Sequence, residues 1–103
     1  KKARKYYLQA VKINESSKEP CLYLAQIEFN NKKYSDAAVH FAKAISLGDD
    51  SVSTHYNHVL ALIMSEQFIP AKRALKNALK KYPENEKLNE LLDRLVDENL
   101  GDQ

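Results

Sequence analysis

Three histidines, His40, His55 and His58, are the side chains of this chain best suited to acid–base chemistry or to metal binding. His55 and His58 lie three residues apart, which places both on one face of a helix. A metal site needs a third ligand with an ordered second shell, and no cysteine or acid stands at a suitable spacing. Two of the three histidines also occupy packing positions of the pattern described below. The favoured interpretation is therefore partly buried, neutral histidine, and neither a catalytic residue nor a metal site is predicted.

The remaining candidates for chemistry are one cysteine and two isolated glycines. Cys21 is the only cysteine, so no intramolecular disulfide can form, which favours a reducing, cytoplasmic compartment. A reactive thiol would need a nearby cation, and Cys21 is expected to be a small packed residue. Gly48 and Gly101 stand alone, so no glycine-rich loop exists to hold a phosphate. No cofactor is expected, and the chain is not predicted to be an enzyme.

Composition and charge fit a single helical domain. Of 103 residues, 44% are hydrophobic and 29% are charged, with a formal net charge of +2. A charge this small and evenly spread is no electrostatic footprint for nucleic acid, and none is expected as a partner. No apolar run is long enough to span a bilayer. Two basic stretches are interpreted as solvated outer faces in preference to contact sites for acidic protein, lipid or RNA. They are Lys1, Lys2, Arg4 and Lys5, and Lys72, Arg73, Lys76, Lys80 and Lys81.

The elements that position all these side chains follow from a repeat. Similar residues recur every 34 positions, and a period of this length predicts stacked copies of one supersecondary unit. The clearest columns are Ala3, Ala37 and Ala71; Tyr7, Phe41 and Leu75; and Ala10, Ala44 and Ala78.

Apolar residues spaced three and four apart predict six amphipathic helices joined by short polar connections. Their expected ranges are 2–13, 19–30, 35–47, 51–65, 69–81 and 85–99. Pro20 and Pro70 fall in first turns, where the missing amide costs nothing, and Tyr82-Pro83 ends the fifth helix. Short connections imply antiparallel neighbours.

In 34-residue frames, the chain resembles the tetratricopeptide repeat family: alanines stand at the close helix contacts and Leu24-Ala25 matches the large-then-small pair. The resemblance implies an all-α, right-handed α-solenoid of antiparallel helix pairs in one domain spanning 1–103. Residues 18–51 and 52–85 would form full repeats, 1–17 the second helix of a preceding repeat, and 86–100 a C-terminal capping helix. Cys21 and His55 depart from the family by standing where Trp is frequent. Leu88, Leu91, Leu92, Leu95 and Val96 are expected to form the buried face of the capping helix.

Family resemblance also implies a concave groove lined by the first helix of each repeat. The expected function is noncatalytic binding of a peptide, a helix or a subunit in that groove; the alternative is a structural spacer or self-assembly segment of a longer array. Leu22, Phe29 and Leu60 fit a core position as well as a groove position. The predicted partner-binding residues are Leu22, Tyr23, Gln26, Phe29, Asn30, Tyr56, Asn57, Leu60, Met64, Lys87 and Glu90.

One subtype of the family clamps the terminal carboxylates of chaperones with cationic and amide side chains. Only Asn57 and Lys87 match that clamp, whereas Leu22 and Leu91 replace two of its cations, so chaperone-tail binding is disfavoured. RNA-binding relatives built from paired helices usually repeat at 35 residues and lack the alanine pattern. A separate prediction concerns the first helix: the face carrying Ala3, Tyr6, Tyr7 and Ala10 would lack its partner helix and would support a homo-oligomer.

Overall fold

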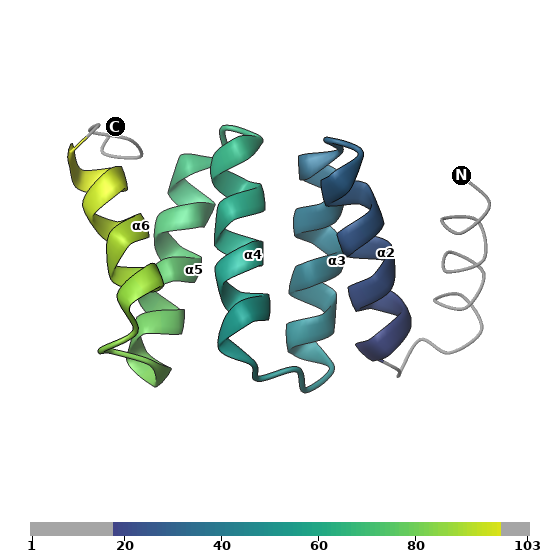
Figure 1. Ribbon diagram of the computed structural model, residues 1–103, viewed down its shortest axis with the longest axis horizontal. Coiled ribbons are helices and arrows are strands. Elements are labelled where there is room, and N and C mark those ends of the chain that lie inside the picture. Colours follow the sequence, from purple (N-terminus) through teal and green to yellow (C-terminus); the bar gives the residue numbers. More distant parts are fainter. Residues whose placement is uncertain (1–17, 98–103) are drawn as a thin grey trace.

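The computed structural model describes residues 18–97, which contain five α-helices (Figure 1). The predicted helix over 2–13 lies outside these residues. Each of the other predicted helices is present, with starts that differ from expectation by one residue and with no β-strand among the described residues. Their bounds are Lys18–Asn30 for α2, Tyr34–Ser46 for α3, Val52–Met64 for α4, Phe68–Lys81 for α5 and Glu86–Asp97 for α6.

The ends of α2, α3 and α4 share one hydrogen-bonded closing turn. A backbone N–H donates to the carbonyl five residues earlier: Lys33 to Glu28 at 2.8 Å, Asp49 to Ala44 at 3.0 Å, and Gln67 to Leu62 at 2.8 Å. Such a turn needs a left-handed residue just before the donor. Glycine fills this position after α3, with φ 110°, whereas α2 and α4 use lysine and glutamate, with φ 63° and 61°. The first and last of these turns are one 34-residue period apart, so the repeat is present in the backbone as well as in the sequence.

Replacing Lys32 with glycine is expected to stabilise the protein by about 0.5–1 kcal/mol, because a left-handed conformation costs a Cβ-bearing residue more than the added unfolded-state entropy of glycine. Urea unfolding followed by circular dichroism measures the change. Lys33→Gly is the matched control: Lys33 is also exposed but has φ −92°, so glycine there gains nothing and destabilises. Equal effects of the two substitutions would contradict the strain assigned to Lys32.

The five helices pack antiparallel, each mainly on the helix that follows it in sequence. Figure 1 shows α2, α4 and α6 in the nearer layer, with α3 and α5 behind them. The only other pair with appreciable contact is α4 with α6, which are neighbours within the nearer layer. Helix α4 therefore contacts three helices, α3 on one side and α5 and α6 on the other, and lies at the centre of the described part of the chain.

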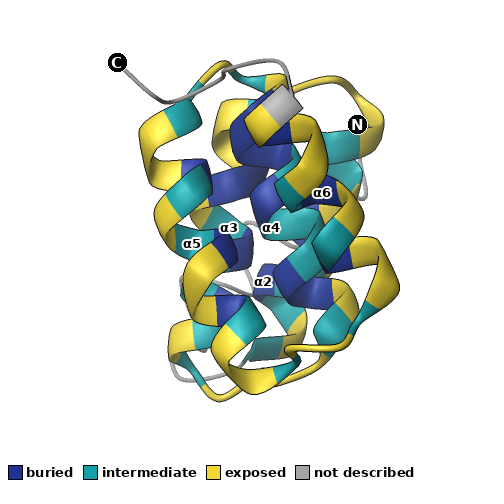
Figure 2. Ribbon diagram, turned by 90° about the vertical axis from the view of Figure 1, so that its left-hand side faces the viewer, coloured by how far each residue is buried: buried dark blue, intermediate teal, exposed yellow. Residues whose placement is uncertain are grey.

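The core lies between the two layers (Figure 2) and is built from the repeat columns. Phe41 and Leu75 are fully buried, and so are the alanines that flank them at 34-residue spacing. Small residues at these positions let the helix axes approach closely while the larger pair fills the remaining space. The buried alanines of these columns are Ala37, Ala44, Ala71 and Ala78.

The apolar face of α6 is narrower than the sequence predicted. Leu88, Leu91 and Leu95 are buried and Leu92 is partly buried, as expected, but Val96 is 57% exposed. The prediction was wrong for Val96 because α5 covers only one side of α6, and a residue one position beyond Leu95 turns away from that side. Asp93 is exposed, so its carboxylate remains in water.

Candidate functional site

His40 and Glu28 form a partly buried pair that joins α3 to α2. The Nδ1 atom of His40 lies 2.7 Å from a carboxylate oxygen of Glu28 and 3.1 Å from the backbone carbonyl of Asp36, so Nδ1–H donates to both. The Glu28 side chain is only 1% exposed, whereas that of His40 is 19% exposed. A buried carboxylate needs a hydrogen-bonding partner of this kind. The pair therefore has a structural role, because His40 supplies the hydrogen bond that the buried Glu28 carboxylate needs.

His55 and His58 are held in the packing of α4. The Nε2 atom of His55 is buried without a hydrogen-bond partner and lies 3.8 Å from a carboxylate oxygen of Asp50. Burial, together with the nearby charge of His55, lowers the pKa of His58 to about 4. His58 is consequently neutral near pH 7, and it is partly buried, as the sequence analysis expected.

Metal binding and thiol chemistry find no support in residues 18–97. No group of three His, Cys, Asp or Glu side chains among them is arranged to hold an ion. Cys21 is fully buried against Leu24 and Ala44, and burial raises the pKa of its thiol. Cys21 thus has the packed environment expected from the sequence, in which the thiolate is disfavoured.

The start of α4 is fixed by Asp49. One of its carboxylate oxygens accepts from the backbone N–H of Ser51 at 2.9 Å and from the Ser51 hydroxyl at 2.8 Å, and the other accepts from the Thr54 hydroxyl at 3.1 Å. Burial opposes ionisation, but these hydrogen bonds outweigh it and hold the pKa of Asp49 below its usual value. The network orders the first turn of α4, which carries Val52 and Ser53.

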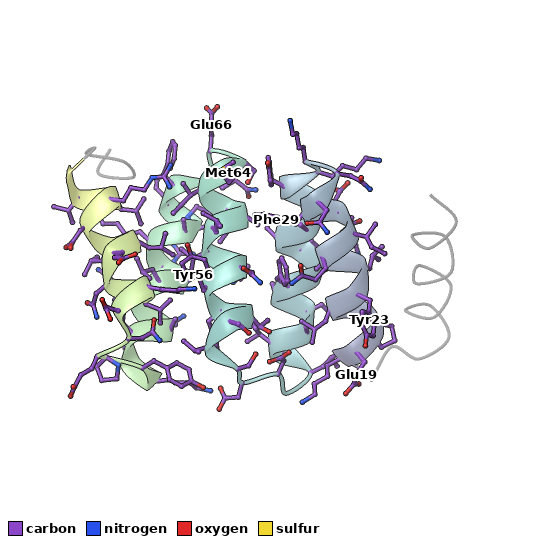
Figure 3. All side chains as sticks on the ribbon, viewed as in Figure 1. Glu19, Tyr23, Phe29, Tyr56, Met64 and Glu66 are labelled. Atoms are coloured by element: carbon purple, nitrogen blue, oxygen red, sulfur yellow. The ribbon has the colours of Figure 1, made fainter. Side chains whose placement is uncertain are left out.

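A depression of about 260 Å³ opens beside that first turn, where α4 meets the beginning of α6. The Lys87 ammonium lies 5.9 Å from the centroid of the Tyr56 ring, a cation–π separation. Figure 3 shows Tyr56 projecting from α4 toward α6. The depression thus combines an aromatic face, amide groups, a hydroxyl and a cation. Its lining residues are Val52, Ser53, Tyr56, Asn57, Asn85 and Lys87.

Asn85 holds the α6 side of this depression. Its side-chain oxygen accepts from the backbone N–H of Leu88 at 3.0 Å, which caps α6, and its backbone carbonyl accepts from the Asn89 amide at 2.9 Å. Capping fixes the first turn of α6 and hence the base of the Lys87 side chain. Three lining residues, Val52, Ser53 and Asn85, are not in the list of predicted partner-binding residues. For Asn85 the sequence does hold a signal, because asparagine immediately before an apolar helical stripe indicates an N-cap.

The structure distributes the predicted partner-binding residues unevenly. Tyr56, Asn57 and Lys87 meet in the depression. Tyr23 lies instead on the side of α2 away from α4, and Met64 lies at the far end of α4 (Figure 3), so neither reaches it.

The other predicted residues divide by burial. Three of them, Leu22, Phe29 and Leu60, are partly buried and pack against the core. The Phe29 ring also packs edge to face on the Tyr34 ring, with 5.1 Å between the ring centroids. The packing of these three residues is compatible with both positions that the sequence left open for them, in the core or in the groove. The exposed ones are Gln26, Asn30 and Glu90.

Residues 18–97 thus form an all-helical unit of five antiparallel helices packed in sequence, with a depression at the start of α4 and α6. Comparisons of the chain with models of known protein families, with curated proteins and with solved structures gave no match. Within residues 18–97, no helix has both the length and the apolar character needed to cross a bilayer.

Proposed function

We propose that this domain is a noncatalytic protein-binding module, and that the depression between α4 and α6 is where it holds a partner peptide. The observation that carries the proposal is that Tyr56 and Asn57 of α4 and Lys87 of α6 line one accessible depression. Asn57 and Lys87 are 30 residues apart in the sequence. These side chains offer apolar contact, an amide that donates and accepts, and a positive charge.

The dimensions of the depression favour a peptide over a small-molecule ligand. Pockets for metabolites and cofactors usually enclose about 300–1,000 Å³ and most of the ligand surface. This depression has about 260 Å³ and is open to solvent, enough for one or two side chains of a longer chain. An extended peptide would place such side chains against the Tyr56 ring while its backbone pairs with the Asn57 amide.

A tetratricopeptide-type repeat supports the same proposal. The columns of alanine and large apolar residues are buried at equivalent positions of the two proposed repeats, 18–51 and 52–85, and the closing turns after α2 and α4 have the same hydrogen bond. In that architecture α2, α4 and α6 would form the groove-facing layer, which contains the depression. The stacking of these repeats into a right-handed solenoid belongs to this proposal.

Peptide display tests the proposal by selection on the parent chain and on a Tyr56→Ala, Asn57→Ala variant that circular dichroism shows to be folded. We expect the parent to select a consensus peptide that binds the variant at least about tenfold more weakly, because contacts at the centre of an interface carry most of its binding energy. Val39→Ala with Asn77→Ala is the matched control, since both residues are exposed on the other layer. Equal enrichment on parent and variant, or no enrichment, would favour the spacer role and contradict the proposal.

A further inference from the structure

Helix α5 concentrates the positive charge of the described chain. Its 14 residues include five lysines and arginines and no acid, although the whole chain carries only +2. Ile69, Arg73, Lys76 and Lys80, which we call the α5 stripe, follow one another at spacings of four, three and four residues. This spacing aligns them along one face of the helix, opposite buried Ala71, Leu75 and Ala78.

The cations of the α5 stripe are exposed and not engaged within the described part of the molecule. No ion pair joins Arg73, Lys76 or Lys80 to a described side chain. Lys81, one position beyond the stripe, behaves differently: its ammonium pairs with Asp50 in the α3–α4 connection. Exposed residues follow the outer side of α5 in Figure 2. Three like charges on successive turns repel one another, and a partner carboxylate would relieve that repulsion.

An apolar residue and a shallow hollow complete this surface. Ile69 is 53% exposed at the beginning of the stripe. It lines a hollow of about 220 Å³ together with Lys72, Arg73 and Lys76. From Ile69 to Lys80 the stripe extends for about 16 Å along the helix axis, or three turns. A complementary ligand is therefore about three helical turns long, acidic, and apolar at one end.

Membranes and nucleic acids fit this surface less well than a protein segment. Insertion into a bilayer needs several large apolar side chains on the basic face, and the α5 stripe has one. Single-stranded nucleic acid is held by stacking aromatics, which the stripe lacks. The exposed acids Glu86, Glu90 and Asp93 on the neighbouring α6 also oppose any extended polyanion, but not a ligand confined to the length of α5.

We propose that the α5 stripe docks an acidic helical segment of a partner protein. Carboxylates spaced four, three and four residues apart in that segment pair with Arg73, Lys76 and Lys80, and one apolar side chain contacts Ile69. This surface lies on the α3–α5 layer and is independent of the α4–α6 depression.

Fluorescence anisotropy with two labelled probe peptides of identical composition tests the pairing on the whole chain. One probe places glutamates on a single helical face at the four-three-four spacing, with a leucine at the end; the other scrambles them around the helix. We expect the aligned probe to bind at least about tenfold more tightly, with an affinity that falls as salt rises. Equal binding of the two probes, or no binding of the aligned one, would overturn the proposal.

Charge reversal locates the contact. The double substitution Arg73→Glu with Lys76→Glu is expected to weaken binding of the aligned probe at least about tenfold. A probe with lysines in place of the glutamates is expected to bind this variant instead. Lys32→Glu with Lys33→Glu makes the same change in net charge in the α2–α3 connection and serves as control. Equal loss with the control would show a net-charge effect only and overturn the proposal.

Competing occupants are separated by three further arms. Tighter binding of anionic phosphatidylserine vesicles or of single-stranded oligo(U) than of the aligned probe would overturn the assignment to a protein segment. A salt-sensitive dimer of the chain alone in sedimentation, lost on Arg73→Glu with Lys76→Glu, would assign the stripe to a second copy and would also overturn it.

Discussion

Replacing Phe41 with alanine is expected to lower the free energy of unfolding by about 3–5 kcal/mol, the range for deleting a buried aromatic side chain. Phe41 is 0% exposed and belongs to the core cluster between the helix layers. A domain of this size has a total stability of about 5–15 kcal/mol. Urea unfolding followed by circular dichroism should therefore show a large fall in midpoint or a chain already unfolded without denaturant.

Phe41→Leu provides the control, because it places at position 41 the residue type that stands at 75, one period later. Leucine keeps most of the buried apolar volume, so the expected loss is below about 1.5 kcal/mol. Leu75→Ala should lose about 2–5 kcal/mol if the two positions are equivalent. A loss below 1 kcal/mol for Phe41→Ala would contradict the burial that defines this column.

Lowering the pH from about 6.5 to 4 is expected to remove about 2–3 kcal/mol of stability through His58 alone. Its pKa is about 4 in the folded protein, against an ordinary value of 6.5. Between these values the unfolded chain binds a proton that the folded chain does not, so protons favour unfolding by about 1.4 kcal/mol per pH unit. The contribution is fully present above pH 6.5 and is lost as the pH falls.

His58→Gln isolates this effect, since glutamine stays neutral throughout the range. Urea unfolding at pH 7.5 measures the packing cost of the substitution, and the same experiment at pH 4.5 measures what remains. We expect the parent to lose more stability than the variant between the two conditions. Identical acid losses in both proteins would show that His58 is accessible to protons in the folded state.

Local order was predictable because it depends on neighbours in sequence. Pro20 and Pro70 fall in first turns of α2 and α5, and Gly48 closes the turn after α3, as expected. Lys32 and Glu66 have the same left-handed conformation without being glycine. Their turns were not predicted, because lysine and glutamate are not residue types that signal a left-handed conformation.

Only part of the candidate site was predictable. The family resemblance placed Tyr56, Asn57 and Lys87 in the groove-facing set, and these three residues line one depression. The same resemblance included Tyr23 and Met64, which lie elsewhere, because it assigns residues to a helix face but does not say where along the helix a neighbouring helix approaches. Asn85 lines the depression because it caps α6, and the groove-facing positions of the family do not include this cap position.

The sequence by itself determined the helices and the 34-residue recurrence of buried positions in this protein, because both depend on local spacing of small and large apolar residues. Only the tertiary structure decided the partners of its polar groups. Glu28 stands one period before buried Leu62, an apolar position, and its buried carboxylate is hydrogen-bonded to His40, which reaches it from α3. Similarly, both Lys80 and Lys81 are exposed, but of these two only Lys81 forms an ion pair among the described residues, with Asp50. Pairings between helices depend on crossing geometry and on the direction of each side chain, neither of which a single sequence contains.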